Sequence, residues 1–190
     1  MQKGFPKELD VDFFLTNEPV KSSKNIDALF DLSGDNLMID HMPAEIPIFK
    51  NAVIKELKYL PKNFIRINAW TGFLNRSITE IVYNNDMEEK VKKVMDALQW
   101  KFLQVPDIPG MIAARIVSMI INEAWFALDD KVSTKSEIDT AMRLGTNYPF
   151  GPFEWGEKIG LQNVIELLKK LSETDNRYEP SPLLLNTYKS

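Results

Sequence analysis

The sequence of 190 residues contains no cysteine and only one histidine, His41. The absence of thiols excludes disulfides, thiolate metal sites, iron–sulfur clusters and cysteine nucleophiles. With a single imidazole the chain cannot build a multi-histidine metal site, and any histidine base has to be His41. Acid–base chemistry in this protein therefore has to come mainly from carboxylates, lysines and tyrosines.

One-sided charge and long apolar runs are also missing. The chain has 23 Lys and Arg against 27 Asp and Glu, a net charge of −4, without a basic stripe, which argues against a nucleic-acid partner. The most apolar stretch, 111–128, is interrupted by Arg115, Asn122 and Glu123 and is too polar for a membrane span. The N-terminus lacks the apolar core of a signal peptide. We expect a cytoplasmic globular protein without a membrane or nucleic-acid partner.

The pattern changes character near residue 106, which predicts two domains, 1–106 and 107–190. In the first, short β-rich runs alternate with helical patterns, which is typical of a parallel α/β layer. The expected strands are 11–16, 36–40, 64–68 and 100–105, and the expected helices are 25–32 and 86–98. The predicted fold class is therefore α/β followed by all-α.

After Pro106 the pattern predicts helices only. The first, 110–129, is apolar over most of its circumference, and its polar residues form one narrow stripe of Arg115, Ser118 and Asn122. A helix of this kind has to be buried on nearly every side, either centrally or at a subunit interface.

Further helices follow along the second domain. Thr134 and Glu137 form a capping box that opens the next helix, and Gly145 is expected to end it. A third helix is expected at 151–172 and a short final one at 181–188. The second domain is therefore expected to be a small helical cluster.

The second domain also carries an ordered set of short motifs. They read DIPGMI at 107–112, NEA at 122–124, EID at 137–139, YPFGPFE at 148–154 and IGL at 159–161. Together they resemble the C-terminal helical domain of the 3-hydroxyacyl-CoA dehydrogenase family, over roughly 105–162. Residues 11–105 resemble, more weakly, the second half of that family's dinucleotide-binding domain. The resemblance implies a truncated Rossmann-like sheet layer packed on a helical domain of the 6-phosphogluconate dehydrogenase C-terminal type.

The same resemblance implies hydride transfer between a 3-hydroxyacyl-CoA and NAD. A Rossmann pyrophosphate site needs G-x-G-x-x-G between the first strand and helix, and no three of the eight glycines in this sequence have that spacing. We interpret the chain as starting after the half-domain that carries this loop. NAD is the family's cofactor, and we expect none for this chain alone, nor a metal.

The resemblance also assigns site positions. Asn68 stands where the family has its catalytic histidine, and Glu80 stands where it has its catalytic glutamate. An asparagine cannot carry a proton at pH 7, so Glu80 is a relic of the orienting carboxylate. Ala114 replaces the family's substrate-site asparagine, and its serine has no counterpart between 40 and 55. His41, at the end of an expected strand where α/β sites commonly lie, is the remaining acid–base candidate.

Three functions remain open after this comparison of positions. The first interpretation is a degenerate member of this family that belongs to fatty-acid and acyl-CoA metabolism. It has no independent NAD-dependent activity, because the glycine-rich loop and the catalytic histidine are absent and most catalytic positions are substituted. One alternative is a non-catalytic module that binds an acyl-CoA-type ligand or regulates a partner, and another is an oxidoreductase that is active only together with another chain. The resemblance further implies a homodimer that pairs through the helical domain.

Overall fold

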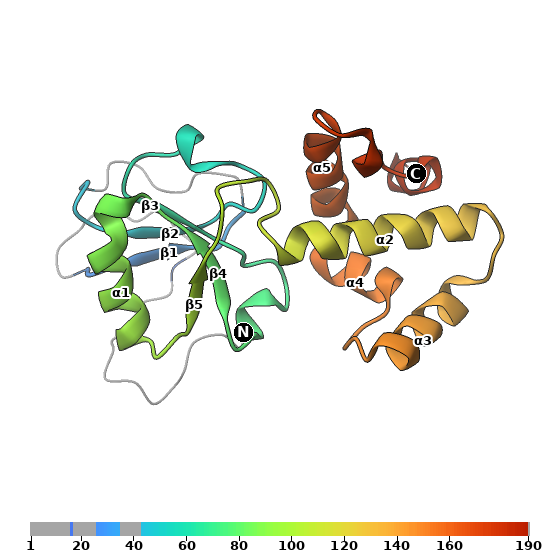
Figure 1. Ribbon diagram of the computed structural model, residues 1–190, viewed down its shortest axis with the longest axis horizontal. Helices are drawn as coiled ribbons and strands as arrows, with labels where there is room; N and C mark the ends of the chain where they lie inside the picture. Colours follow the sequence, from blue (N-terminus) through green and yellow to red (C-terminus); the bar gives the residue numbers. More distant parts are fainter. Residues whose placement is uncertain (1–15, 17–25, 35–42, 190) are drawn as a thin grey trace. The chain divides into compact units, whose positions relative to one another are not determined.

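The computed structural model of the protein describes Thr16 and residues 26–34 and 43–189. Most of the strand expected at 11–16, the strand expected at 36–40 and His41 therefore lie outside the described residues. The chain divides into two compact units, Met1–Met111 and Ile112–Ser190 (Figure 1). In the described part of the chain, no helix has the length and apolar character that crossing a membrane requires.

The first unit is built on one five-stranded sheet. Its strands, in spatial order, are β1 (Leu29–Asp31), β2 (Ile48–Asn51), β3 (Phe64–Ile67), β4 (Thr79–Val82) and β5 (Phe102–Gln104). β1, β2 and β3 are parallel, β4 is antiparallel to β3, and β5 is parallel to β4. The expected parallel layer is thus confirmed except at the β3–β4 step. That step reverses direction because a short connection joins the two strands, and a parallel pairing needs a longer crossover.

The local sequence pattern was wrong at the first strand. A helix was expected at 25–32, whereas Leu29–Asp31 form β1, and β2 was not expected at all. The Phe30 ring stacks on Phe49 of β2 with 4.5 Å between ring centroids. This cross-strand contact outweighs the weak helical preference of the segment. The strands expected at 64–68 and 100–105 correspond to β3 and β5.

One face of the sheet is covered by α1 (Glu88–Ala97), which follows a 3-10 turn at Asn85–Met87, as the helix expected at 86–98 predicted (Figure 1). Val91 and Met95 of α1 are fully buried in a core that includes Phe49, Ile65 and Ile81. Because side chains alternate along a strand, the strand residues next to Phe49, Ile65 and Ile81 point to the opposite face of the sheet.

The second unit is entirely helical. It contains α2 (Ala113–Asp129), α3 (Lys135–Thr146), α4 (Pro152–Ile159), α5 (Leu161–Ser172) and α6 (Pro182–Lys189). The long helix α2 contacts α4, α5 and α6 (Figure 1). Its polar stripe points inward: Ser118 and Asn122 are buried, whereas Ile112 and Ile116 are exposed. The expectation that α2 is buried on nearly every side is therefore not met within one chain.

Two helix ends differ from those expected. Gly145 does not end its helix, because α3 continues to Thr146 and Asn147 takes the left-handed conformation at φ 55°. Asparagine tolerates this conformation better than most residues. The single helix expected at 151–172 is broken at Gly160, whose φ of 89° is incompatible with a continuous helix and separates α4 from α5.

Candidate functional site

The candidate site lies at the carboxyl ends of β2 and β3, where ligands bind in open α/β sheets. Asn51 ends β2, and Asn68 directly follows β3. The Oδ1 of Asn51 accepts a hydrogen bond from the Ala69 N–H at 3.1 Å, and the Oδ1 of Asn68 accepts one from the Trp70 N–H at 3.3 Å. Both side chains are buried, so these two amides fix the chain as it leaves the sheet.

The second polar atom of Asn68 has no partner. Its Nδ2 is buried and makes no hydrogen bond to any described group. A buried donor without an acceptor costs about 1–3 kcal/mol, so native structures rarely leave one unmatched. The residue that replaces the expected histidine therefore presents an N–H donor at the strand end, and it cannot act as a base.

Glu80 is the neighbour of Asn68 across the sheet. Ile67 pairs with Ile81 in the antiparallel register, so Asn68 and Glu80 occupy the next pair of positions and share a face of the sheet. The Glu80 side chain is mostly buried, and its Oε1 lies 3.9 Å from Nη1 of Arg76. The structure thus brings together the two residues that the family resemblance assigned to the base and its orienting carboxylate.

The other two candidate residues, Ala114 and His41, add no described polar group to the site at the carboxyl ends of β2 and β3. Ala114, the second residue of α2, belongs to the second unit and is fully buried. His41 lies outside the described residues. Among the described residues, no three His, Asp or Glu side chains gather in a way that could hold a metal ion.

A buried ion pair joins β1 and β2, and the sequence analysis did not predict it. The Lys50 Nζ lies 2.7 Å from Oδ2 of Asp31, and both side chains are almost wholly buried. Burial alone raises the pKa of Asp31, but hydrogen bonds from Lys50 and Ser33 outweigh it and hold that pKa below its usual value. The signal was present in the sequence, since each charge interrupts an otherwise apolar run.

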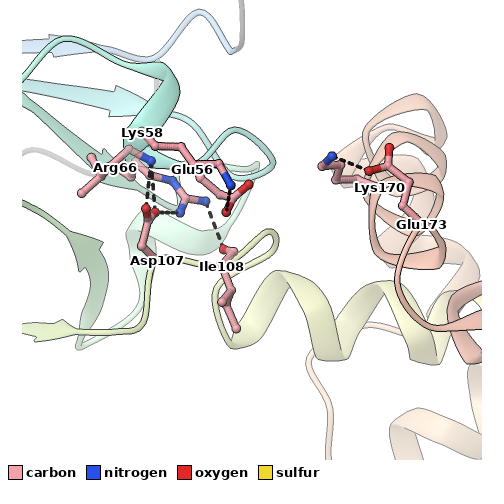
Figure 2. Close-up of polar contacts among 8 residues, drawn as sticks. Glu56, Lys58, Arg66, Asp107, Ile108, Lys170 and Glu173 are labelled. Atoms are coloured by element: carbon pink, nitrogen blue, oxygen red, sulfur yellow. Dashed lines mark hydrogen bonds and ion pairs between the residues drawn. The ribbon is translucent and has the colours of Figure 1, made fainter.

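Arg66 of β3 forms a second buried charged group, shown in Figure 2. Its Nε and Nη2 donate to the two carbonyls of residues 52–53, each at 2.9 Å, and Nη2 also donates to the Ile108 carbonyl at 3.2 Å. Nη1 pairs with Asp107, whose two oxygens each accept from the Leu57 N–H at 3.1 Å (Figure 2). Because these partners all belong to the chain itself, we assign Arg66 and Asp107 a structural role.

The motif residues of the second unit are also internal ties. Gly151 is the N-cap of α4 and has no side chain to cap the helix, and Asp139 of α3 takes over that role. Its carboxylate accepts hydrogen bonds from the Phe153 N–H at 2.8 Å and the Glu154 N–H at 3.3 Å. The spacing of the EID and YPFGPFE motifs therefore reflects the docking of α4 on α3.

Asn122 plays the same part for the segment before α6. Its Oδ1 accepts from the Ser181 N–H and its Nδ2 donates to the Glu179 carbonyl, both at 2.8 Å. The described contacts of these motif residues are structural, and they define a domain fold more than a reaction.

Comparisons with known proteins also identify the second unit as a known domain. The sequence model of the family described as "3-hydroxyacyl-CoA dehydrogenase, C-terminal domain" matches residues 110–190. The chain is 50% identical over 84 residues to a 3-hydroxyadipyl-CoA dehydrogenase of Escherichia coli K12, a match that covers 43% of this chain and 18% of that protein. It is 27% identical over 130 residues to a probable 3-hydroxybutyryl-CoA dehydrogenase of Deinococcus radiodurans, covering 65% of this chain and 47% of that protein.

Solved structures extend the similarity to the first unit. A 3-hydroxybutyryl-CoA dehydrogenase structure from Escherichia coli K12 matches 88% of this chain and 34% of that one, with a TM-score of 0.62 and 30% identity. An (S)-3-hydroxybutyryl-CoA dehydrogenase from Ralstonia eutropha matches 86% of this chain and 65% of that one, with a TM-score of 0.71 and 20% identity, which shows the shared fold.

The fold is thus a Rossmann-like sheet layer followed by a helical domain, as in dehydrogenases that act on acyl-CoA substrates. Residues 110–190 match the C-terminal domain of the 3-hydroxyacyl-CoA dehydrogenase family. It spans less than half the length of these two curated relatives, 18% of the Escherichia coli protein and 47% of the Deinococcus one.

Proposed function

We propose that this chain serves acyl-CoA metabolism as a member of its family that does not itself transfer hydride. The observation that carries this proposal is Asn68, an amide at the strand end where the resemblance expects the catalytic base. Glu80 beside it has no imidazole to orient among the described residues. Instead, the unmatched Nδ2 of Asn68 suits an acceptor, such as the oxygen of an acyl-CoA-type ligand.

Activity is tested by following the nicotinamide absorbance with NAD and either 3-hydroxybutyryl-CoA or 3-hydroxyadipyl-CoA. We expect no turnover from the wild type or from Asn68→His. A positioned general base supplies a factor of about 10²–10⁴, but the described residues offer no glycine loop to hold the hydride acceptor. Clear turnover by either protein would overturn the proposal, as would calorimetric binding of NAD with micromolar affinity.

Ligand binding is tested separately, by calorimetry with 3-hydroxybutyryl-CoA. The Asn68→Leu variant keeps the approximate size of the side chain and removes the Nδ2 donor together with the Oδ1 that accepts the Trp70 N–H. If that donor meets a ligand oxygen, affinity should fall about tenfold, the equivalent of one hydrogen bond of about 1.4 kcal/mol. Equal binding by wild type and variant would remove Asn68 from the site.

A second candidate function is pairing through the helical unit, and α2 carries the observation in its favour. Ile112 and Ile116 are 42% and 52% exposed, and Met119, Ile120 and Phe126 continue the same stripe half-buried. An exposed apolar stripe of this kind marks an association surface. We propose that a second copy of the chain covers it, since a two-fold contact lets one patch cover itself. A related dehydrogenase with the same domain is the alternative occupant.

Light scattering at micromolar concentration distinguishes these states. A homodimer is expected at twice the 21.9 kDa of one chain. A stable monomer would exclude self-association, and mixing with a full-length dehydrogenase of the family then tests the other occupant.

A further inference from the structure

A hollow of about 200 Å³ opens in the first unit, between the segment that precedes β4 and the turn that joins α1 to β5. It is lined mainly by polar side chains and one indole ring, those of Arg76, Ser77, Thr79, Gln99, Lys101 and Trp100. The hollow has room for a small ligand group, and none of the expected site residues lines it.

The turn that forms one wall is fixed by its own hydrogen bonds. Gln99 takes a left-handed conformation at φ 53°, its N–H bonds to the Asp96 carbonyl at 2.9 Å, and the Trp100 N–H bonds to the Met95 carbonyl at 2.9 Å. These two bonds close the C-terminal end of α1, as in a Schellman motif. The Trp100 ring packs edge-on against Phe30 at 5.9 Å. The wall is therefore formed before any ligand arrives.

Both ionisable side chains that line the hollow are cations. The Arg76 guanidinium lies 5.8 Å from the centre of the Phe73 ring and 3.9 Å from the Glu80 carboxylate, and these two contacts limit its movement. Lys101 is exposed, and its ammonium group has no ion pair or hydrogen bond with the described residues. Because Glu80 offsets part of the Arg76 charge, the ammonium of Lys101 leaves a net positive charge beside the hollow, in a protein whose net charge is −4.

Two hydroxyl groups add neutral donors to the lining of the hollow. Neither Ser77 nor Thr79 uses its hydroxyl for a hydrogen bond with the described residues, and Thr79 is only 5% exposed. Thr79 therefore lines the hollow with a hydroxyl that no described group engages. The lining of the hollow thus offers two cationic side chains and two hydroxyls, and the acceptor that suits such donors best carries negative charge.

We infer that the hollow binds a small oxyanion, the carboxylate or phosphate group of a ligand. Arg76 and Lys101 supply charge-assisted hydrogen bonds, and the Thr79 hydroxyl supplies a third donor. This inference rests on the hollow alone and goes beyond the proposed function, because neither Asn68 nor the helical unit takes part in it.

The test is an NMR titration of the full chain with two probes, inorganic phosphate and adipate, each against sodium chloride at matched ionic strength. The indole N–H signal of Trp100, assigned with a Trp100→Phe variant, reports binding at the wall. We expect saturable shifts with one probe or both. The double variant Arg76→Gln/Lys101→Gln should weaken that binding at least tenfold, since each lost charge-assisted hydrogen bond is worth about that factor.

A matched control removes the same number of positive charges at positions away from the hollow. The double variant Lys55→Gln/Lys93→Gln removes two exposed lysines that do not line the hollow and should bind both probes like the wild type. Saturation with phosphate alone assigns a phosphate group as the ligand, and saturation with adipate alone assigns a carboxylate. The inference is overturned if neither probe saturates, or if both double variants weaken binding equally.

Discussion

Replacing Gly151 by alanine should destabilise the helical unit strongly, because α3 and α4 meet at this residue without room for a side chain. An added Cβ would lie 2.3 Å from Oδ1 of Asp139 and 2.4 Å from its Cα and Cβ. Since backbone atoms form part of the contact, the two helices have to separate. Overpacking costs about 1–3 kcal/mol, and the loss of the Asp139 cap on α4 adds about 1 kcal/mol. We expect a decrease of about 2–4 kcal/mol in the free energy of unfolding.

The same substitution at Gly145 is the control. Gly145 lies inside α3, and an added Cβ meets no atom within 4 Å. Alanine in a helix is favoured over glycine by about 0.5–1 kcal/mol, so Gly145→Ala should stabilise the protein. Urea unfolding followed by near-UV circular dichroism measures both variants, since Trp125 and Phe153 form an edge-on pair in this unit. Similar small effects of the two substitutions would refute the steric argument.

A third variant separates the cap from the steric contact. Asp139→Ala removes the carboxylate that accepts the Phe153 and Glu154 N–H groups and leaves Cα and Cβ in place. Gly151→Ala should therefore remain destabilising in the Asp139→Ala background. If the second substitution became neutral there, the carboxylate alone would cause the clash, and the backbone contact would not matter.

Three further outcomes are expected. Lys50→Met leaves the carboxylate of Asp31 buried without its cation and should cost about 3–5 kcal/mol in denaturant unfolding; a loss below 1 kcal/mol would contradict this. Hydroxyls of residues 133–134 lower the pKa of Glu137 from 4.5 to about 2, so its stabilising effect is complete above pH 4.5 and is lost as the pH falls to 2. Glu137→Gln should therefore flatten the dependence of Tm on pH in that window, and an unchanged slope counts against it. Ile116→Asp should give a monomer by light scattering while the wild type is a dimer; a dimeric variant would place the contact elsewhere.

Local signals predicted the helical unit well. The capping box expected at Thr134 and Glu137 is confirmed, with the Glu137 N–H bonded to Oγ1 of Thr134 at 3.3 Å and the Thr134 N–H bonded to the Glu137 carboxylate at 3.1 Å. Such bonds join residues three apart, so the sequence shows them directly. The break at Gly160 was missed because helical periodicity continues on both sides of it, and only the backbone conformation reveals the stop.

Long-range partners account for most of what sequence reasoning missed in the first unit. Lys50 finds Asp31 nineteen residues away, and Arg66 finds Asp107 forty-one residues away. No periodicity connects such pairs, because sheet pairing and loop return bring them together. The proximity of Asn68 and Glu80 was implied by the family resemblance, and the antiparallel register of β3 and β4 supplies its physical reason.

The two faces of α2 link the sequence pattern to the proposed pairing. A surface helix normally buries its apolar residues and exposes its polar ones. The buried face of α2 is mostly apolar, but it also includes Ser118 and Asn122, while Ile112 and Ile116 remain exposed. Inside the unit the amide of Asn122 is fully used, because two backbone groups before α6 require it. On the outer side, full burial of a large apolar side chain is worth about 1.5–3 kcal/mol, and Ile112 and Ile116, which are 42% and 52% exposed, would gain about half of that when covered. The buried amide of Asn122 is therefore explained by contacts within one chain, and we propose that another surface covers the exposed apolar side chains.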